Sequence, residues 1–166
     1  MLNILLDTNI VVDFYEGGIL FALNTSLFSV SNIVLNEEIL KQIKNFSFDK
    51  IQIIKEEYLE LMEANKLQTV DKGVSFIDAL NVAIAKERSM CLATGDQKLK
   101  KVAESLKVQC FGTIKLIEIL IEEKLLTISE GVNCLNEIRN NLKRRLPKDL
   151  IEKTIDQINK KEKILI

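Results

Sequence analysis

The sequence Asn3-Ile4-Leu5-Leu6-Asp7-Thr8-Asn9 decides how the rest of the chain is interpreted. Residues 3–6 are typical of a parallel strand buried on both faces, because no polar alternation interrupts the apolar run. Asp7 follows where such a strand ends and a helix begins, which is the edge at which open α/β sheets bind ligands. Two interpretations stay open: Asp7 is a functional carboxylate, or the segment is only a helix start capped by Thr8 or Asn9.

Strand-like and helical segments alternate over most of the chain. Strands are expected at 3–6, 27–30, 51–54, 90–93 and 108–111, and helices at 10–16, 33–44, 56–67, 76–88, 97–106 and 114–123. This alternation predicts a parallel sheet of about five strands with helices on both faces. In the 33–44 helix, Leu35, Ile39, Leu40 and Ile43 are expected on one apolar face.

Beyond residue 125 the pattern is purely helical. Ser129 is expected to cap one helix that reaches about residue 142, and Pro147 to open another that reaches the C-terminus. We therefore expect an α/β domain over residues 1–125 and a helical extension over 126–166 that packs on the same domain.

The composition excludes several classes of catalytic site. The chain of 166 residues has no histidine, which rules out zinc sites that combine Cys with His and all Ser-His or Cys-His catalytic pairs. Cys91, Cys110 and Cys134 are odd in number and widely spaced, which favours free buried thiols over a disulfide framework. No apolar run approaches the roughly 18 residues of a membrane span and no signal-like segment is recognised, so we expect a cytoplasmic protein.

Charge is distributed unevenly along the chain. The net charge is −1, but residues 139–166 carry nine basic and four acidic side chains, which leaves −6 on the first 138 residues. A basic C-terminal segment on an acidic body indicates a polyanion or an acidic protein as partner. A solvated helix face rich in lysine explains the same charges.

Four acidic side chains are expected near the sheet edge. Asp7 and Asp96 each follow a predicted strand, and parallel strands all end at one edge. Glu37 lies in the first turns of the helix after the second strand. Asp78 lies in the first turn of the helix before the fourth strand, and we expect that helix to begin at the opposite edge unless it crosses the sheet obliquely.

Asp78 is the acid whose surroundings favour a site most strongly. Its helical neighbours are nearly all apolar, and the first basic residue after it is Lys86. Burying a lone charge costs several kcal/mol, so the carboxylate must be paired, metal-bound or protonated. Acids that share a site repel one another unless a divalent cation neutralises them, and oxygen ligands without His or Cys favour Mg²⁺ or Mn²⁺.

Such a carboxylate cluster supports metal-assisted attack of water on a phosphodiester. The alternative is that each acid only stabilises the N-terminal turn of a helix.

Four stretches, in this order, resemble the acidic motifs of PIN-domain nucleases. They are Leu5-Leu6-Asp7-Thr8-Asn9, Ser31-Asn32-Ile33-Val34-Leu35-Asn36-Glu37, Asp78-Ala79-Leu80-Asn81-Val82-Ala83-Ile84-Ala85 and Ala93-Thr94-Gly95-Asp96-Gln97-Lys98-Leu99. Each motif is weak alone, and the ordered set is fairly specific. The resemblance covers roughly residues 1–125, which would form the nuclease domain.

This resemblance implies a three-layer α/β/α sandwich and Mg²⁺- or Mn²⁺-dependent cleavage of single-stranded or structured RNA. Carried over by position, the catalytic and metal-binding carboxylates are Asp7, Glu37, Asp78 and Asp96, and Asn9 and Thr94 are polar supports that orient ligands or water. The resemblance also implies that the helix start at Asp78 reaches the same pocket as the other acids. Many family members are VapC-type toxins, which implies an antitoxin protein as partner and a homodimer.

Two features depart from the family pattern. Glu38 adjoins Glu37, lies nearer the apolar face and is an alternative second acid. The helical tail is longer than the core of the smaller toxins. Its basic residues Arg139, Lys143, Arg144 and Arg145 are expected to contact RNA phosphates without reading sequence, unless the tail only packs through its leucine and isoleucine side chains.

Two rival functions remain. The first is a PIN-like RNA- or protein-binding module that keeps the fold without turnover, against which the four intact acids argue. The second is a phosphate-handling receiver-like domain. That class requires paired acids near the start and a lysine after the last strand, whereas Asp7 has no acidic neighbour and residues 108–113 contain no lysine.

Overall fold

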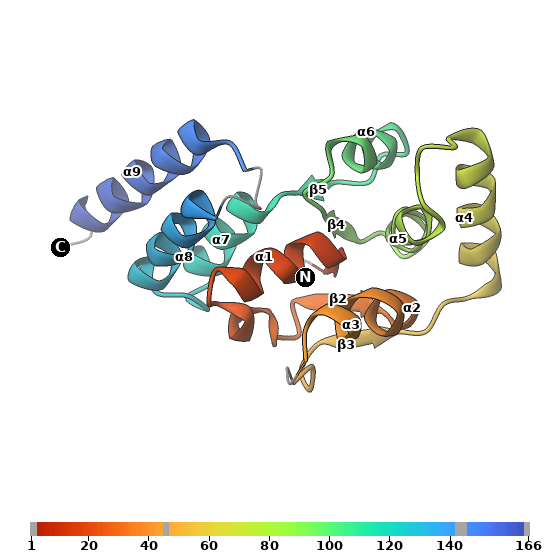
Figure 1. Ribbon diagram of the computed structural model, residues 1–166, viewed down its shortest axis with the longest axis horizontal. Helices are drawn as coiled ribbons and strands as arrows, with labels where there is room; N and C mark the ends of the chain where they lie inside the picture. The colour runs from red at the N-terminus through yellow and green to blue at the C-terminus, as the bar shows by residue number, and fades with distance from the viewer. Residues whose placement is uncertain (1–2, 45–46, 142–145, 165–166) are drawn as a thin grey trace.

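The computed structural model describes residues 3–44, 47–141 and 146–164, and within them the strands form one parallel sheet (Figure 1). Its five strands lie in the order β3-β2-β1-β4-β5, so that β1 is central. The strands are β1 (Ile4–Leu6), β2 (Phe28–Ser31), β3 (Gln52–Ile54), β4 (Cys91–Ala93) and β5 (Cys110–Phe111).

Helices connect these strands and continue beyond them. They are α1 (Thr8–Glu16), α2 (Asn32–Val34) and α3 (Leu40–Gln42), α4 (Tyr58–Val70), α5 (Phe76–Glu87), α6 (Gln97–Ser105), α7 (Thr113–Glu122), α8 (Ile128–Asn140) and α9 (Lys148–Ile164), with a 3₁₀ turn η1 (Leu20–Leu23) and a π-helical segment η2 (Leu35–Ile39) that joins α2 to α3.

The side chains of β1 divide the core into two halves. Ile4 and Leu6 pack into the half that contains α1, η2, α7 and α8, whereas Leu5 packs into the half that contains α5 and α6. All three side chains are fully buried, as the absence of polar alternation in this strand predicts. Helices therefore cover both faces of the sheet, and the expected three-layer α/β/α architecture is confirmed.

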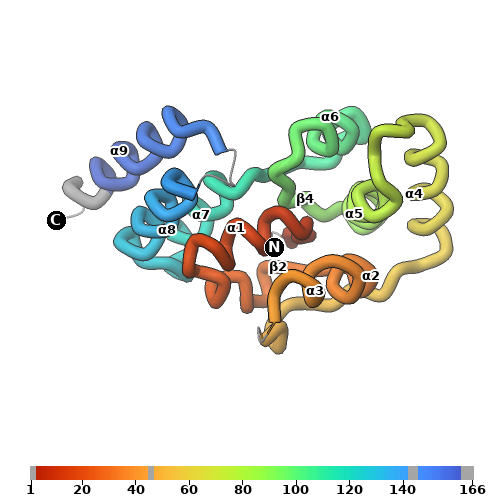
Figure 2. The backbone as a smooth tube through the Cα atoms, in the orientation of Figure 1, coloured from red at the N-terminus to blue at the C-terminus, as the bar shows by residue number. Residues whose placement is uncertain are grey.

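The C-terminal helices pack beside the first and seventh helices. Gly131 of α8 approaches α7 so closely that an added Cβ would lie 2.6 Å from the Cδ1 atom of Ile121. Asn141, which follows α8, donates a 2.6 Å hydrogen bond to the carboxylate of Glu16 at the end of α1. Figure 2 shows α8 and α9 at one end of the long axis and α4 at the other. The expected domain boundary at residue 125 stays a prediction.

Three local expectations are wrong for identifiable reasons. Thr127, not Ser129, caps α8, because Thr127 and Glu130 bond to each other's backbone N–H groups and leave Ser129 inside the first turn. Leu40 is 41% exposed, whereas Leu35, Ile39 and Ile43 are buried, because residues four apart share one helix face and Leu40 lies about 100° away from that line. Of the three free cysteines, only Cys134 is buried, while Cys91 and Cys110 are half-buried.

Within the described residues, no helix is long and apolar enough to cross a membrane.

Candidate active site at the carboxyl edge of the sheet

A cavity of about 430 Å³ opens where β1 ends, and acidic side chains form most of its charged lining. The elements around it are the first turns of α1, α5 and α6 and the η2–α3 segment. Its lining residues are Asp7, Thr8, Asn9, Glu37, Glu38, Lys41, Gln42, Ser75, Asp78 and Asp96. The structure thus brings the four carboxylates expected from the sequence to one cavity, which we call the acidic cavity.

Asp7 is the innermost of these acids, with only 2% of its surface exposed. Its backbone N–H donates to the carbonyl of Ala93 in β4 (3.0 Å), which fixes it between the two central strands. Its carboxylate accepts from the N–H of Thr8 (2.8 Å) and from the hydroxyl of Thr94 (2.8 Å). Asp7 itself is therefore the N-cap of α1, whereas the sequence offered Thr8 or Asn9 for that role. Asp7 therefore caps α1 and is also a candidate metal ligand.

The side chain of Asp7 meets only neutral donors among the described residues. Besides Thr8 and Thr94, the amides of Asn9 and Asn81 lie 3.5 Å from its two oxygens. Burial raises the pKa of this carboxyl from 3.8 to about 6; the hydroxyl of Thr94 and the N–H of Thr8 act against that rise, and the negative charges of Asp78 and Glu38 add to it. A cation beside Asp7 would remove this penalty.

Asp78 lies at the same edge as Asp7. It is half-buried, and its carboxylate accepts a 2.7 Å hydrogen bond from the hydroxyl of Ser75, the N-cap of α5. The expectation that α5 begins at the opposite edge is wrong, because α5 runs antiparallel to β4 and so starts where the strands end. The position implied by the family resemblance is the one observed.

Glu37 and Glu38 both line the acidic cavity, but they differ in their contacts. Glu37 is exposed and forms a 2.7 Å ion pair with Lys41, whose hydrogen bond and charge lower the pKa of Glu37. Glu38 is half-buried and accepts a short hydrogen bond from the hydroxyl of Thr8, next to Asp7. Both residues lie in the π-helical segment η2. Of the two, the structure brings Glu38 closer into the network around Asp7.

Thr94 and Asp96 connect β4 to the acidic cavity. The Thr94 hydroxyl donates to Asp7 and accepts from the N–H of Asp96 (3.1 Å), which links two of the carboxylates through one side chain. Asp96 also caps α6, accepting from the N–H groups of Lys98 (2.7 Å) and Leu99 (3.0 Å). Thr94 is thus buried and hydrogen-bonded to Asp7, as a residue that supports a ligand would be.

Asn81 was not singled out in the sequence analysis, yet it belongs to this network. It is completely buried on α5, one turn after Asp78, and its amide nitrogen lies 3.5 Å from Asp7. Its Oδ1 atom is a buried oxygen without a hydrogen-bond partner among the described residues. The sequence does contain a signal for Asn81, because it is an amide on an otherwise apolar helix, three residues after Asp78.

The donor set fits a hard divalent cation in its chemistry. Five carboxylates and two amides line the acidic cavity, and within the described part of the chain Lys41 is the only basic side chain of the lining. Among the described residues, no three acidic, cysteine or histidine side chains already stand together as a metal-binding group. The carboxylates placed where they could hold a divalent cation are those of Asp7, Asp78, Asp96 and either Glu37 or Glu38.

Of the expected RNA-binding residues, Arg139 is described, and it does not line the acidic cavity. Arg139 lies on α8 and forms a 3.5 Å ion pair with Glu152 of α9. The end of α8 is bonded to the C-terminal end of α1, whereas the acidic cavity lies at the N-terminal end of α1. Lys143, Arg144 and Arg145 lie outside the described residues.

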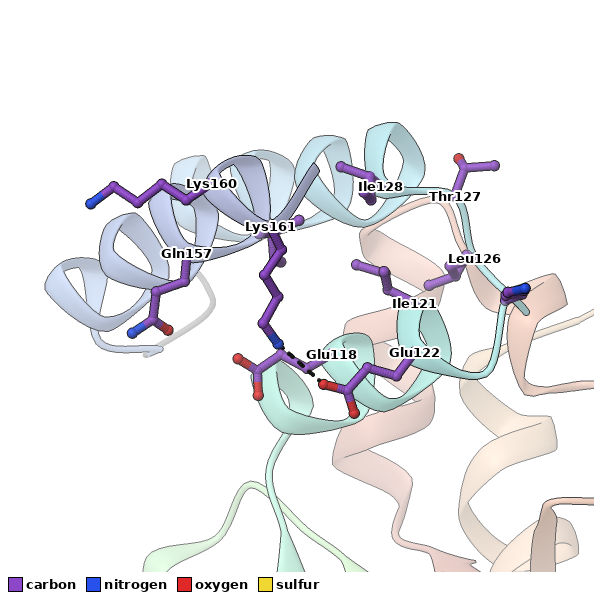
Figure 3. Close-up of a pocket in the computed structure, with 11 residues that line it drawn as sticks. Glu118, Ile121, Glu122, Leu126, Thr127, Ile128, Gln157, Lys160 and Lys161 are labelled. Atoms are coloured by element: carbon purple, nitrogen blue, oxygen red, sulfur yellow. Dashed lines mark hydrogen bonds and ion pairs between the residues drawn. The ribbon is translucent and has the colours of Figure 1, made fainter. Parts of the chain in front are cut away.

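A larger cavity of about 860 Å³ lies between α7 and α9 and contains none of the expected site residues. Its walls include Ile121, Leu126 and Ile128, and Lys161 of α9 reaches across it to Glu122 of α7 at 3.4 Å (Figure 3). This cavity shares no lining residue with the acidic cavity.

Asp7→Asn is expected to stabilise the protein at neutral pH. The folded-state pKa is raised, so the folded protein binds the proton more tightly than the unfolded chain and loses stability as pH rises from about 4 to 6. The substitution removes a penalty of about 3 kcal/mol above pH 6 and almost nothing below pH 4. Urea unfolding across this pH range measures the difference. Asp156→Asn, at an exposed position of α9, is the control; a variant destabilised at every pH contradicts the prediction.

Asn81→Leu is expected to raise the free energy of unfolding by about 1–3 kcal/mol, since an unsatisfied buried oxygen is removed. The same substitution should reduce the rise in melting temperature that Mn²⁺ produces, because Asp7 loses a neighbouring donor. Thermal unfolding with and without Mn²⁺ measures both effects. A loss of stability in metal-free buffer would show instead that Asn81 is needed for packing.

Comparison with known proteins agrees with this geometry. A family model described as a PIN domain matches residues 4–160, which includes the sheet, the acidic cavity and nearly all of the C-terminal helices. Comparison with curated protein sequences gives no match. PIN domains are generally nucleases and generally use divalent metal ions. The match spans almost the whole chain, and the protein belongs to the PIN-domain family.

Proposed function

We propose that this protein is an endoribonuclease that uses Mg²⁺ or Mn²⁺ to hydrolyse RNA phosphodiester bonds. The observation that carries the proposal is the buried carboxylate of Asp7, which is surrounded by neutral donors and by two further acids. A fold that only needed a helix cap at this position would be served by serine or threonine without the cost of a buried charge.

The residues of the acidic cavity divide into ligands and supports. Asp7, Asp78, Asp96 and Glu38, with Glu37 as the alternative second acid, would hold the cation. When bound, Mg²⁺ or Mn²⁺ supplies Lewis-acid activation of water and neutralises the charge that develops on the phosphate. Thr94 holds one oxygen of Asp7 in place, and Asn9 supports the same oxygen at longer range.

The proposed biological role is that of a toxin in a toxin–antitoxin pair, acting in the cytoplasm as a homodimer. The resemblance to the VapC-type toxins supports this role, its antitoxin partner and the dimer. Phosphate contacts by Arg139, Lys143, Arg144 and Arg145 are part of the same proposal, supported by the net positive charge of the C-terminal segment.

Cleavage of a mixed RNA pool by the purified protein is expected with Mn²⁺ and is expected to stop with EDTA. Asp7→Asn and Asp78→Asn should each lower the rate by at least about a hundredfold, since each removes a charged ligand of the cation. Asp156→Asn, which makes the same chemical change on α9, should cleave at the wild-type rate. A wild-type protein that binds RNA or a partner protein tightly yet cleaves nothing would establish the non-catalytic binding module instead.

Glu38→Gln is expected to lower the cleavage rate more than Glu37→Gln. Glu38 lies in the hydrogen-bond network of Thr8 and Asp7, whereas Glu37 is exposed and already paired with Lys41. The comparison is matched, because both variants remove one charge from neighbouring positions of one segment. Rates at several Mn²⁺ concentrations measure the difference, and a larger effect at Glu37 would assign the second acid to that residue.

A further inference from the structure

A second cavity of about 380 Å³ lies beside the acidic cavity, and we call it the lysine pocket. Its walls come from the loop after β4, the first turn of α7 and the first turns of α9. Its lining includes Thr94, Gly95, Lys100, Gly112, Lys115, Glu118, Lys153 and Thr154.

The two cavities share one short wall. Thr94 and Gly95 line the lysine pocket, while Asp96, the next residue, lines the acidic cavity. Three residues of chain span at most about 10 Å. A linear molecule that occupies the acidic cavity therefore has the lysine pocket within reach of its neighbouring units.

The lysine pocket is positively charged, in contrast to its neighbour. Lys100, Lys115 and Lys153 contribute to its lining against one acid, Glu118. Lys100 and Lys115 form ion pairs of 3.8 and 3.1 Å with exposed or partly exposed partners on their own helices, which cost little to rearrange. Lys153 is exposed and forms no ion pair within the described part of the chain.

Backbone donors add to these charges. α7 is ten residues long and begins after Gly112, which has no side chain to accept from the first N–H groups of the helix. The hydroxyl of Thr113 is directed to Asp13 instead. The first N–H groups of a helix have no partner within the helix and favour an anion at this end.

Thr154 is the observation that points to a ligand independently of charge. Only 3% of its surface is exposed, and it lines the lysine pocket from α9. Its hydroxyl forms no hydrogen bond within the described residues, and it is not one of their fully buried unpaired atoms, so it is accessible from the pocket. A ligand in the pocket with acceptor oxygens would satisfy it.

We propose that the lysine pocket binds a backbone phosphate of the RNA strand, adjacent to the phosphate that is cleaved in the acidic cavity. This inference rests on the proposed nuclease function. The oxygens of a phosphodiester are acceptors only, and they match a site composed of ammonium groups, helix N–H groups and a hydroxyl. The five carboxylates of the acidic cavity repel RNA, so a neighbouring positive site is needed to hold the strand over them.

The test is the affinity for a short, fluorescently labelled single-stranded RNA, measured by anisotropy in EDTA at several salt concentrations. Lys100→Gln, Lys115→Gln and Lys153→Gln are each expected to weaken binding and to reduce the slope of log affinity against log salt, together by about 0.7, the value for one phosphate of a single strand. Thr154→Val keeps the side-chain shape and removes the hydroxyl, and it should weaken binding about threefold to tenfold. Lys66→Gln, on α4 far from the pocket (Figure 1), is the matched control and should leave affinity and slope unchanged.

The outcomes separate this inference from the nuclease proposal, because EDTA removes cleavage from the measurement. Lysine and Thr154 variants that bind RNA like Lys66→Gln, or a wild type that binds no RNA, overturn the phosphate site. Binding that depends on the lysine pocket, in a protein that cleaves nothing with Mn²⁺, supports the site and overturns the nuclease. Thermal unfolding of each variant checks that the fold is kept.

Discussion

The carboxylate of Asp7 lies buried at the centre of the sheet edge, and its hydrogen-bond partners among the described residues carry no charge. Each of these partners comes from a different part of the fold. Thr8 begins α1, Thr94 ends β4 and Asn81 lies on α5, so three elements must dock correctly before the carboxylate is held. The central position of β1 makes this convergence possible, since it places Asp7 between both halves of the sheet.

The sequence predicted the five strands and most helices because the signals for them are local. An unbroken apolar run such as residues 3–6 has few alternatives to a buried strand, and a serine before an apolar helix, as at Ser75, marks the helix start in the structure. Errors arose where a signal depended on geometry beyond the pattern. Leu40 is exposed because the buried face narrows to Leu35, Ile39 and Ile43, and the edge at which α5 begins follows from chain direction rather than from residue type.

The candidate site was predictable as a set of acids but not as a network. Asp7, Asp78 and Asp96 stand next to recognisable element boundaries, and the structure brings them to one cavity. The difference between Glu37 and Glu38 is a matter of which side chain reaches Thr8, and that depends on the local helix type. Asn81 and Thr154 could not be identified from the sequence, because the lack of a hydrogen-bond partner is visible only when the surroundings of a side chain are known.

The order of the strands also bears on how the protein is made. The hydrogen bond between Asp7 and Thr94 joins residues 87 positions apart, and β1 needs β4 as its neighbour on that side. At about 5–20 residues per second, roughly 4–17 seconds separate the synthesis of the two residues. The nascent chain thus carries its first acid long before it can assemble the pocket around it. The acidic cavity therefore forms only after more than half of the 166 residues have been joined to the chain.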